Sequence, residues 1–384
     1  MPAVLLLAAM GCEKDVPVEM DTEYSYSWDR SEENPKNSEY LSLINDMTSR
    51  GVPGVMMAIS RGNDVWLGTA GYSSLKTMTP MLSDNRTRVG STVKTFTAVT
   101  ILQLYEEGRL SLDDKVSDYL SADVLKDIES ADKATIRQLL CHSSGIYNYI
   151  QDLKFQTASM NDLTKEWFPE ELLSYARGRS AYFEPDEDCY YSNTGYILLG
   201  KVIEAVCGRP FYKEFEDRIF RPLGMSETAF AEEDPVPDDL VRGYVDFFST
   251  MKLLESTWYS GWDYHTADGG LISNPYNLTL FMQALFDGTL LKEETLSEML
   301  SFKSPKTQDP EYYEMGYGLG IFRYRTSKGD IYGHSGDAIG YYAIMLYHPE
   351  SDTAISWAVN GNYGNLDAIF SSKAAMDRIF NTVF

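Results

Sequence analysis

Hydrophobic positions near the start of the chain follow first a helical and then an extended pattern. The spacing of one helix face is kept by four apolar residues, Tyr40, Leu41, Ile44 and Met47. Ser38 is a candidate N-cap of this helix, and Gly51 follows its end. Two β-like runs come next, at residues 55–60 and 64–70, separated by Arg61-Gly62-Asn63. This turn composition between two apolar runs predicts a β-hairpin.

The C-terminal part of the chain has a similar combination of extended runs and a helix. Four runs joined by Gly, Pro, Asp and Ser turns predict strands, at residues 318–324, 331–334, 341–347 and 353–360. An apolar-patterned segment from Leu366 to Phe380 predicts a closing helix.

Residues 92–293, between these two ends, have a mainly helical pattern. We therefore predict an α+β fold in which an antiparallel sheet is built from both chain ends, is flanked by helices and carries a large helical insertion. A single domain would span residues 37–384, with residues 37–91 and 294–384 as its α/β part. The active site is expected in the cleft between the two parts.

The first twelve residues predict a targeting segment. Val4 to Met10 is an apolar run too short to span a bilayer, and Ala9-Met10-Gly11 leads into Cys12. This pattern resembles a bacterial lipoprotein signal, although no Lys or Arg precedes the run and Ala9 stands where Leu is commonest. A conventional secretory signal and a simple chain terminus are the alternatives. We predict export to the bacterial cell envelope with a lipid on Cys12 as the only membrane attachment, and a polar tether over residues 13–36.

Composition narrows the range of partners. The 384 residues are 43% hydrophobic, which is enough for a sizeable core, and carry a formal charge of −24. Such a charge repels nucleic acid, anionic lipid and polyphosphate, so none of these is expected as a partner. Beyond Cys12, Cys141, Cys189 and Cys207 suggest no disulfide framework, and no CxxC or HExxH metal motif is present.

Ser-x-x-Lys occurs four times, starting at Ser73, Ser91, Ser130 and Ser249. Only Ser91 follows a glycine and opens a long apolar run, which ends at Gly108 and predicts a buried helix. At that spacing Lys94 lies one turn on and on the same face as Ser91. Burial lowers a lysine pKa, so Lys94 could accept the serine proton, and the helix N-terminus could stabilise an oxyanion. The alternative is an N-capping serine with an incidental lysine.

Two further motifs add candidate chemistry. Tyr191-Ser192-Asn193 precedes a helical pattern at residues 194–206, so a phenol could pass protons and an amide could bind a substrate carbonyl. His334-Ser335-Gly336 ends a predicted strand, with the N–H of Asp337 as a second oxyanion donor. His334 is expected to be a partly cationic donor toward a substrate carboxylate or toward Tyr191. Taken singly, these residues are more often turn formers.

Together and in this order, the three motifs resemble the active-site signature of the serine β-lactamase and penicillin-binding-protein superfamily. The tyrosine form of the second motif is similar to class C β-lactamases and to the D-alanyl-D-alanine carboxypeptidases and esterases related to them. Flanking segments agree, namely residues 135–140, 142–145, 191–200, 222–225 and 268–271, so the resemblance covers residues 38–384.

The resemblance implies an acyl-enzyme mechanism without cofactor or metal. Ser91 would be the nucleophile, Lys94 and Tyr191 would share the acid and base work, and Asn193 would position the substrate. Which of Lys94 and Tyr191 takes the first proton stays open. The N–H groups of Ser91 and Asp337 would hold the oxyanion.

The third motif bears on the substrate. Class C β-lactamases usually have Lys where this chain has His334, and the sequence around His334-Ser335-Gly336 looks closest to the carboxypeptidase branch. Arg323 is placed like the arginine that receives a terminal carboxylate there, and Arg325 should share its face. We therefore expect a D-alanyl-D-alanine carboxypeptidase-like peptidase with a small peptide or ester substrate and a β-lactam as a further ligand. A broad esterase or class C-like β-lactamase and a non-catalytic envelope binding protein are the alternatives.

Overall fold

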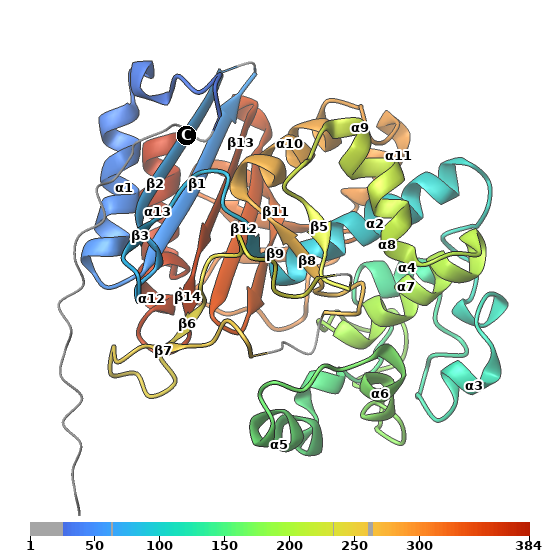
Figure 1. Ribbon diagram of the computed structural model, residues 1–384. Coiled ribbons are helices and arrows are strands. Elements are labelled where there is room, and N and C mark those ends of the chain that lie inside the picture. The colour runs from blue at the N-terminus through green and yellow to red at the C-terminus, as the bar shows by residue number, and fades with distance from the viewer. Residues whose placement is uncertain (1–25, 63, 233, 260–263) are drawn as a thin grey trace, which may run out of the picture.

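The computed structural model describes residues 26–62, 64–232, 234–259 and 264–384 (Figure 1). An eight-stranded sheet runs through it in the order β3-β2-β1-β13-β12-β11-β10-β9, and every neighbouring pair is antiparallel. The strands are β1 (Gly54–Arg61), β2 (Asp64–Ser74), β3 (Thr79–Pro80), β9 (Glu314–Tyr317), β10 (Phe322–Thr326), β11 (Gly329–Ala338), β12 (Tyr341–His348) and β13 (Thr353–Val359). Since β1 pairs with β13, the predicted sheet built from both chain ends is confirmed.

Side-chain alternation along the strands gives the sheet two apolar faces. On β13, Ile355 and Trp357 pack toward the terminal helices α1 (Asn37–Ser49) and α13 (Lys373–Val383). Ala354 and Ala358 point the other way, where α10 (Pro275–Phe286) crosses the sheet. Figure 1 shows α1 and α13 on one side of the sheet and the helical part on the other. Because both faces are covered, the central strands are apolar at most positions rather than alternating regularly with polar residues, and the few polar side chains in them, such as Ser60 and Ser356, are also buried.

The helical part contains one central helix, α2 (Val93–Glu106), which is buried except at its last turn and packs against α7 (Asn193–Cys207) and α8 (Phe211–Phe215). The other helices of this part are α3 (Ala122–Leu125), α4 (Ile136–Leu140), α5 (Leu153–Asn161), α6 (Pro169–Ser174), α9 (Arg221–Leu223) and α11 (Glu293–Met299). Two small sheets, β4-β8-β5 and β14-β6-β7, lie beside β12 of the main sheet. Their strands are β4 (Thr87–Arg88), β5 (Ala229–Phe230), β6 (Tyr244–Val245), β7 (Leu254–Glu255), β8 (Leu271–Ser273) and β14 (Gly361–Asn362).

Some predicted boundaries were wrong. Of the expected strand at residues 318–324, residues 318–321 form the bend between β9 and β10, in which the N–H of Gly318 donates to the carbonyl of Ile321, and β10 begins only at Phe322. The closing helix is divided into α12 (Asp367–Phe370) and α13, because Ser372 leaves the helical conformation and its hydroxyl caps the N–H of Ala375. Ser38 lies inside α1 rather than at its N-cap.

The predicted tether is partly folded onto the domain. Asp29 and Ser31 are buried, and the Ser31 hydroxyl accepts the N–H of Leu67 at 2.6 Å. Tyr26 and Trp28 pack against Tyr276 with ring centroids 5.1 and 5.0 Å away. The folded part therefore includes residues 26–36, where the sequence predicted a polar connection. The predicted signal, Cys12 and the tether up to residue 25 lie outside the described residues.

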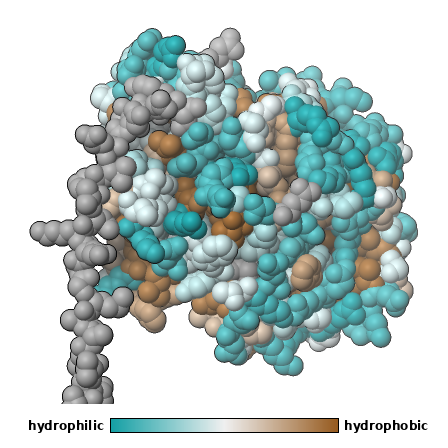
Figure 2. All heavy atoms as spheres, viewed as in Figure 1, coloured by the Kyte–Doolittle hydropathy of each residue, from teal (hydrophilic) through white to brown (hydrophobic). Residues whose placement is uncertain are grey.

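Hydrophilic residues cover most of the face shown in Figure 2. Cys141 and Cys189 are buried and Cys207 is half-buried, all three as free thiols. None of the helices within the described part of the chain combines the length and the apolar character needed to cross a membrane.

Candidate active site

Ser91 lies in a tight turn that leads into the buried helix α2. The turn is a 3₁₀ helix at Gly90–Thr92, and it places Lys94 in the first turn of α2. The Lys94 Nζ donates a hydrogen bond to Ser91 Oγ at 2.9 Å and another to the backbone carbonyl of Asp268 at 2.5 Å. The side chain of Lys94 is fully buried. A lysine held against a serine hydroxyl in this way can exchange a proton with it.

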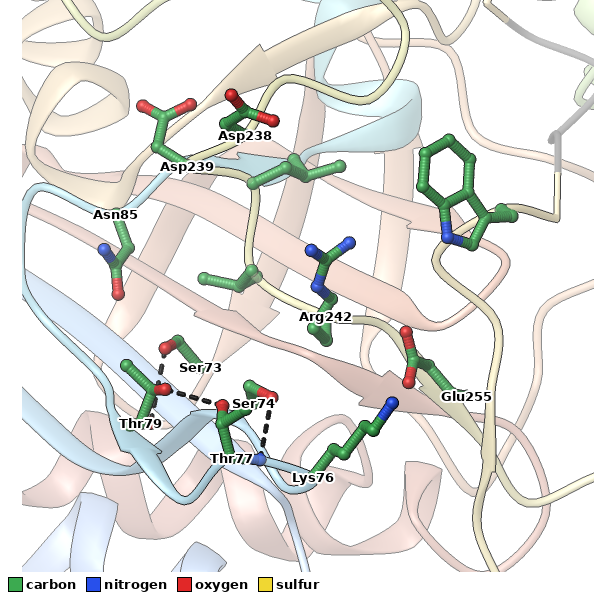
Figure 3. A pocket seen from close by; sticks show the side chains of 13 residues that line it. Ser73, Ser74, Lys76, Thr77, Thr79, Asn85, Asp238, Asp239, Arg242 and Glu255 are labelled. Carbon is green, nitrogen blue, oxygen red and sulfur yellow. Dashed lines mark hydrogen bonds between the residues drawn. The ribbon is translucent and has the colours of Figure 1, made fainter. Parts of the chain in front are cut away.

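The other three Ser-x-x-Lys matches do not have this geometry. The Ser73 hydroxyl bonds the backbone carbonyls of Thr79 and Pro80, while Lys76 extends toward Glu255 in a separate pocket of about 560 Å³ (Figure 3). Ser130 and Ser249 have φ of 70° and 52°, which no helical turn allows. Only Ser91 has its lysine alongside.

Tyr191 lies on the other side of Ser91, at the end of the loop before α7. Its phenol is hydrogen-bonded to Ser91, and the Lys94 Nζ is 5.1 Å from the centre of its ring. Burial raises the pKa of Tyr191 well above its usual value, and the bond with Ser91 only partly opposes this. The phenol is therefore protonated at neutral pH. It can donate a proton to a leaving group.

Asn193 begins α7 and lines the same cleft. Its N–H donates to Asn148 Oδ1 at 3.2 Å, and the Asn148 amide donates to the carbonyl of Tyr191 at 3.3 Å. Asn148 thus holds the loop on which both Tyr191 and Asn193 lie. The two side chains reach the cleft from one rigid loop-to-helix junction.

The last part of β11 forms the opposite wall. Its pairing with β10 ends at Phe322↔Gly333, so His334 to Asp337 border the cleft on that side. A Cβ on Gly336 would lie 2.1 Å from the Val89 carbonyl oxygen and 2.5 Å from the backbone N of Ser91. Glycine is required there, and the close approach brings the N–H groups of Ser91 and Asp337 to the same end of the cleft. Two converging N–H donors are what an oxyanion needs.

His334 differs from its predicted charge state. Its side chain is 1% exposed, and burial, followed by the charge of Lys94, lowers the pKa of His334 to about 3. The ring is therefore neutral at physiological pH rather than partly cationic. Its Nδ1 lies 2.6 Å from the carbonyl of Ser335, which can only accept, so Nδ1 carries the hydrogen and Nε2 is an acceptor.

Arg323 does not lie in the cleft, where it was predicted to receive a terminal carboxylate. Its guanidinium lies over the ring of Phe302, 5.1 Å from the centre, and within 4.0 and 3.9 Å of Glu314 and Asp330. Arg323 does not line the cleft, whereas its neighbour Phe322 does. Arg325 shares the face of Arg323, as expected, and pairs with Glu314 at 2.9 Å. Neither arginine is placed to receive a carboxylate beside Ser91.

The cleft has a volume of about 550 Å³. Its described lining comprises Ser91, Ile150, Tyr191, Asn193, Asp268, Met315, Tyr317, Phe322, His334, Ser335, Gly336, Asp337, Tyr363 and Asp367.

Two acidic residues of this lining were missed from the sequence as site residues, Asp268 and Asp367. Asp268 is buried beside Lys94, and its Oδ2 accepts the phenol of Tyr149 at 3.2 Å. Burial raises the pKa of Asp268, while the charge of Lys94 opposes the shift. Asp268 precedes two glycines in one of the segments that resemble the family, but nothing in the local sequence marks its carboxylate as part of a site.

This arrangement defines a class of protein: an α+β domain in which a lysine and a tyrosine are both hydrogen-bonded to a serine at the N-terminus of a buried helix. The family model described as Beta-lactamase matches residues 42–377. The chain belongs to this family, whose members are serine hydrolases that act through an acyl-enzyme.

Two curated relatives illustrate the range of the family. The chain is 29% identical over 302 residues to Penicillin-binding protein 4* of Bacillus subtilis, an alignment of 76% of this chain and 64% of that protein. It is 26% identical over 386 residues to the human mitochondrial serine beta-lactamase-like protein LACTB, covering 78% of this chain and 69% of that one.

Solved structures of two hydrolases superpose over nearly the whole domain. A D-stereospecific amidohydrolase from Streptomyces is 31% identical, with a TM-score of 0.76 over 88% of this chain and 98% of that one. D-amino acid amidase from Ochrobactrum anthropi is 27% identical, with a TM-score of 0.80 over 91% and 99%.

Proposed function

We propose that this protein is a serine hydrolase that cleaves an amide bond in a small substrate derived from D-amino acids, with Ser91 as the nucleophile. The observation that supports this best is the contact of 2.9 Å between Lys94 Nζ and Ser91 Oγ in a cleft that also contains Tyr191. An amidase and an amidohydrolase with D-specificity in their names are among its structural relatives.

In the proposed reaction, Ser91 Oγ attacks the substrate carbonyl carbon while its proton passes to Lys94. The oxyanion forms between the N–H groups of Ser91 and Asp337. Collapse of the tetrahedral intermediate breaks the C–N bond, and the leaving amine takes a proton from Tyr191, which burial keeps protonated. Water then loses a proton to the Tyr191 phenolate and attacks the ester carbonyl. As the C–O bond to Ser91 breaks and the acid is released, Lys94 returns its proton to Ser91 Oγ.

The narrower prediction is a D-alanyl-D-alanine carboxypeptidase. His334-Ser335-Gly336 supports it by resemblance, but Arg323 lies over Phe302 and does not line the cleft. Release of a terminal D-residue from a small peptide would support this prediction. A broad esterase or β-lactamase would instead turn over p-nitrophenyl esters or nitrocefin without releasing a residue.

Covalent labelling tests the proposal directly. We expect a fluorophosphonate to add one adduct to Ser91, detected by peptide mass spectrometry, and benzylpenicillin to form a slower one on the same residue. Ser91→Ala should abolish both adducts, whereas the matched variant Ser73→Ala, at a second Ser-x-x-Lys, should label like the natural protein. Absence of any adduct on Ser91 would contradict the proposal and favour a non-catalytic binding protein.

We also propose that the chain is exported and lipid-anchored through Cys12. The motif around Cys12 supports this. In a bacterial host, labelled palmitate should enter the natural chain and not Cys12→Ser. Equal incorporation into both would refute the anchor.

A further inference from the structure

Two carboxylates of the cleft lining, those of Asp337 and Asp367, lie outside the group of residues that contact Ser91 Oγ. Asp337 contributes the proposed oxyanion N–H, so its side chain emerges next to that position, where solvent can reach it. Asp367, at the start of α12, lines the same cleft, and its Oδ1 accepts the N–H of Tyr363 at 2.7 Å. The two therefore belong to the substrate-binding surface.

The two carboxylates are close enough to influence each other. The surrounding walls of the cleft, followed by the charge of Asp367, raise the pKa of Asp337 to about 7, while a hydrogen bond from Asn362 opposes the shift. No arginine or lysine is found among the described residues that line the cleft, and Lys94 is turned toward Ser91 and Asp268. A like-charged pair without a facing cation favours a positively charged ligand group.

His334 is an independent indication of the same chemistry. It lines the cleft and is 1% exposed, and its Nε2 has no hydrogen-bond partner within the described part of the chain. Because Nδ1 donates to the carbonyl of Ser335, Nε2 can only accept. This wall therefore presents acceptors, which suits a donor-rich group and repels a carboxylate.

We propose that Asp337 and Asp367 form a subsite for a primary ammonium group of the substrate. The inference rests on the proposed function and names its substrate class: an amide whose acyl residue carries a free amine. The α-carbon of an acyl residue is bonded to the carbonyl that the oxyanion donors hold, so an α-amino group would come near Asp337. A side-chain ammonium on a longer residue could reach the same carboxylates.

The ammonium subsite can be tested by measuring how well small amides compete with a fluorophosphonate for Ser91, which does not require the amides to be hydrolysed. The probes are D-phenylalanine amide, with an α-ammonium, N-acetyl-D-lysine amide, with a side-chain ammonium, and N-acetyl-D-phenylalanine amide, with neither. The full chain is labelled at pH 7.5 with each probe in increasing concentration, and the rate of Ser91 modification gives an apparent Kd. The variants are Asp337→Asn and Asp367→Asn. Asp123→Asn, which removes an exposed carboxylate on α3 away from the cleft, is the matched control.

We expect at least one ammonium probe to bind about tenfold more tightly than the neutral probe, which corresponds to one charge-assisted contact. The probe that does so identifies the source of the ammonium. Asp337→Asn should reduce this preference to about twofold or less on the same scale, Asp367→Asn should reduce it in the same direction, and Asp123→Asn should preserve it.

Equal binding of the three probes to the natural protein, or a preference that survives Asp337→Asn, would overturn the subsite while leaving the proposed function intact. Failure of Ser91 to label at all would instead overturn the proposed function, and the subsite with it. Melting curves of each variant show whether a lost preference comes from lost folding.

Discussion

The two walls of the cleft are built in opposite ways. On the wall formed by the helical part, Lys94 is fully buried and Tyr191 is half-buried, and both are bonded to Ser91. On the sheet wall, Asp337 is open to solvent and Asp367 is half-buried. Groups that move protons must be held in one geometry, whereas groups that choose a substrate must remain reachable. The difference suggests that the helical wall sets the reaction and the sheet wall sets the substrate.

Removing the lysine should have the largest effect. Lys94→Ala takes away the group in contact with the nucleophile, and we expect kcat/KM to fall by about 10⁴-fold for any amide substrate. The loss should be nearly equal for charged and neutral substrates if the helical wall serves only the reaction.

Lys76→Ala, at the second Ser-x-x-Lys, is the matched control and should retain full activity. If Lys94→Ala lowered kcat/KM only for substrates that carry an ammonium group, the helical wall would also select the substrate, which contradicts the separate roles of the two walls. Thermal melting of both variants checks that each is folded.

Asp268→Asn should change the pH dependence of the helical wall. The carboxylate of Asp268 stabilises the charged form of Lys94, and the proposed mechanism needs Lys94 neutral. Without that negative charge Lys94 loses its proton at lower pH, so the acid limb of kcat/KM should shift downward by about one pH unit. An unchanged limb, measured with a neutral substrate between pH 5 and 9, would show that Asp268 has no influence on the titrating base.

The sheet wall should show a smaller pH effect, limited to ammonium-bearing ligands. The pKa of Asp337 is raised to about 7, so Asp337 is charged above that pH and gains a proton below it. As the pH falls through about 7, the attraction between the Asp337 carboxylate and the ammonium group of the probe weakens. The Kd of an ammonium probe should then rise about three- to tenfold relative to that of the neutral probe. Asp337→Asn should remove this dependence. Identical pH profiles for both probes would argue against a charged subsite.

The sequence could predict the parts of the site that local pattern determines. Ser91 and Lys94 are joined by one helical turn, so their contact could be derived from their spacing together with the long apolar run that follows Ser91. The neutral state of His334 depends on burial beneath Phe322, with ring centroids 4.2 Å apart, and burial of that kind is decided by tertiary packing. Asp367 reaches the cleft only because α12 returns to the sheet, so no local pattern marks it.

Arg323→Ala should have the smallest effect, and it tests the carboxypeptidase prediction. The guanidinium packs on Phe302 and is near Glu314 and Asp330, so truncation should cost no more than about 1 kcal/mol of stability. Because Arg323 does not line the cleft, kcat/KM for a peptide with a free terminal carboxylate should change by less than about threefold, a difference well below 1 kcal/mol of binding free energy. Arg325→Ala, on the same face and more exposed, is the matched control. The contrary result would be a tenfold rise in KM for that peptide that is absent when its terminal carboxylate is amidated. It would mean that Arg323 turns into the cleft when the peptide binds, and that the sheet wall recognises a carboxylate.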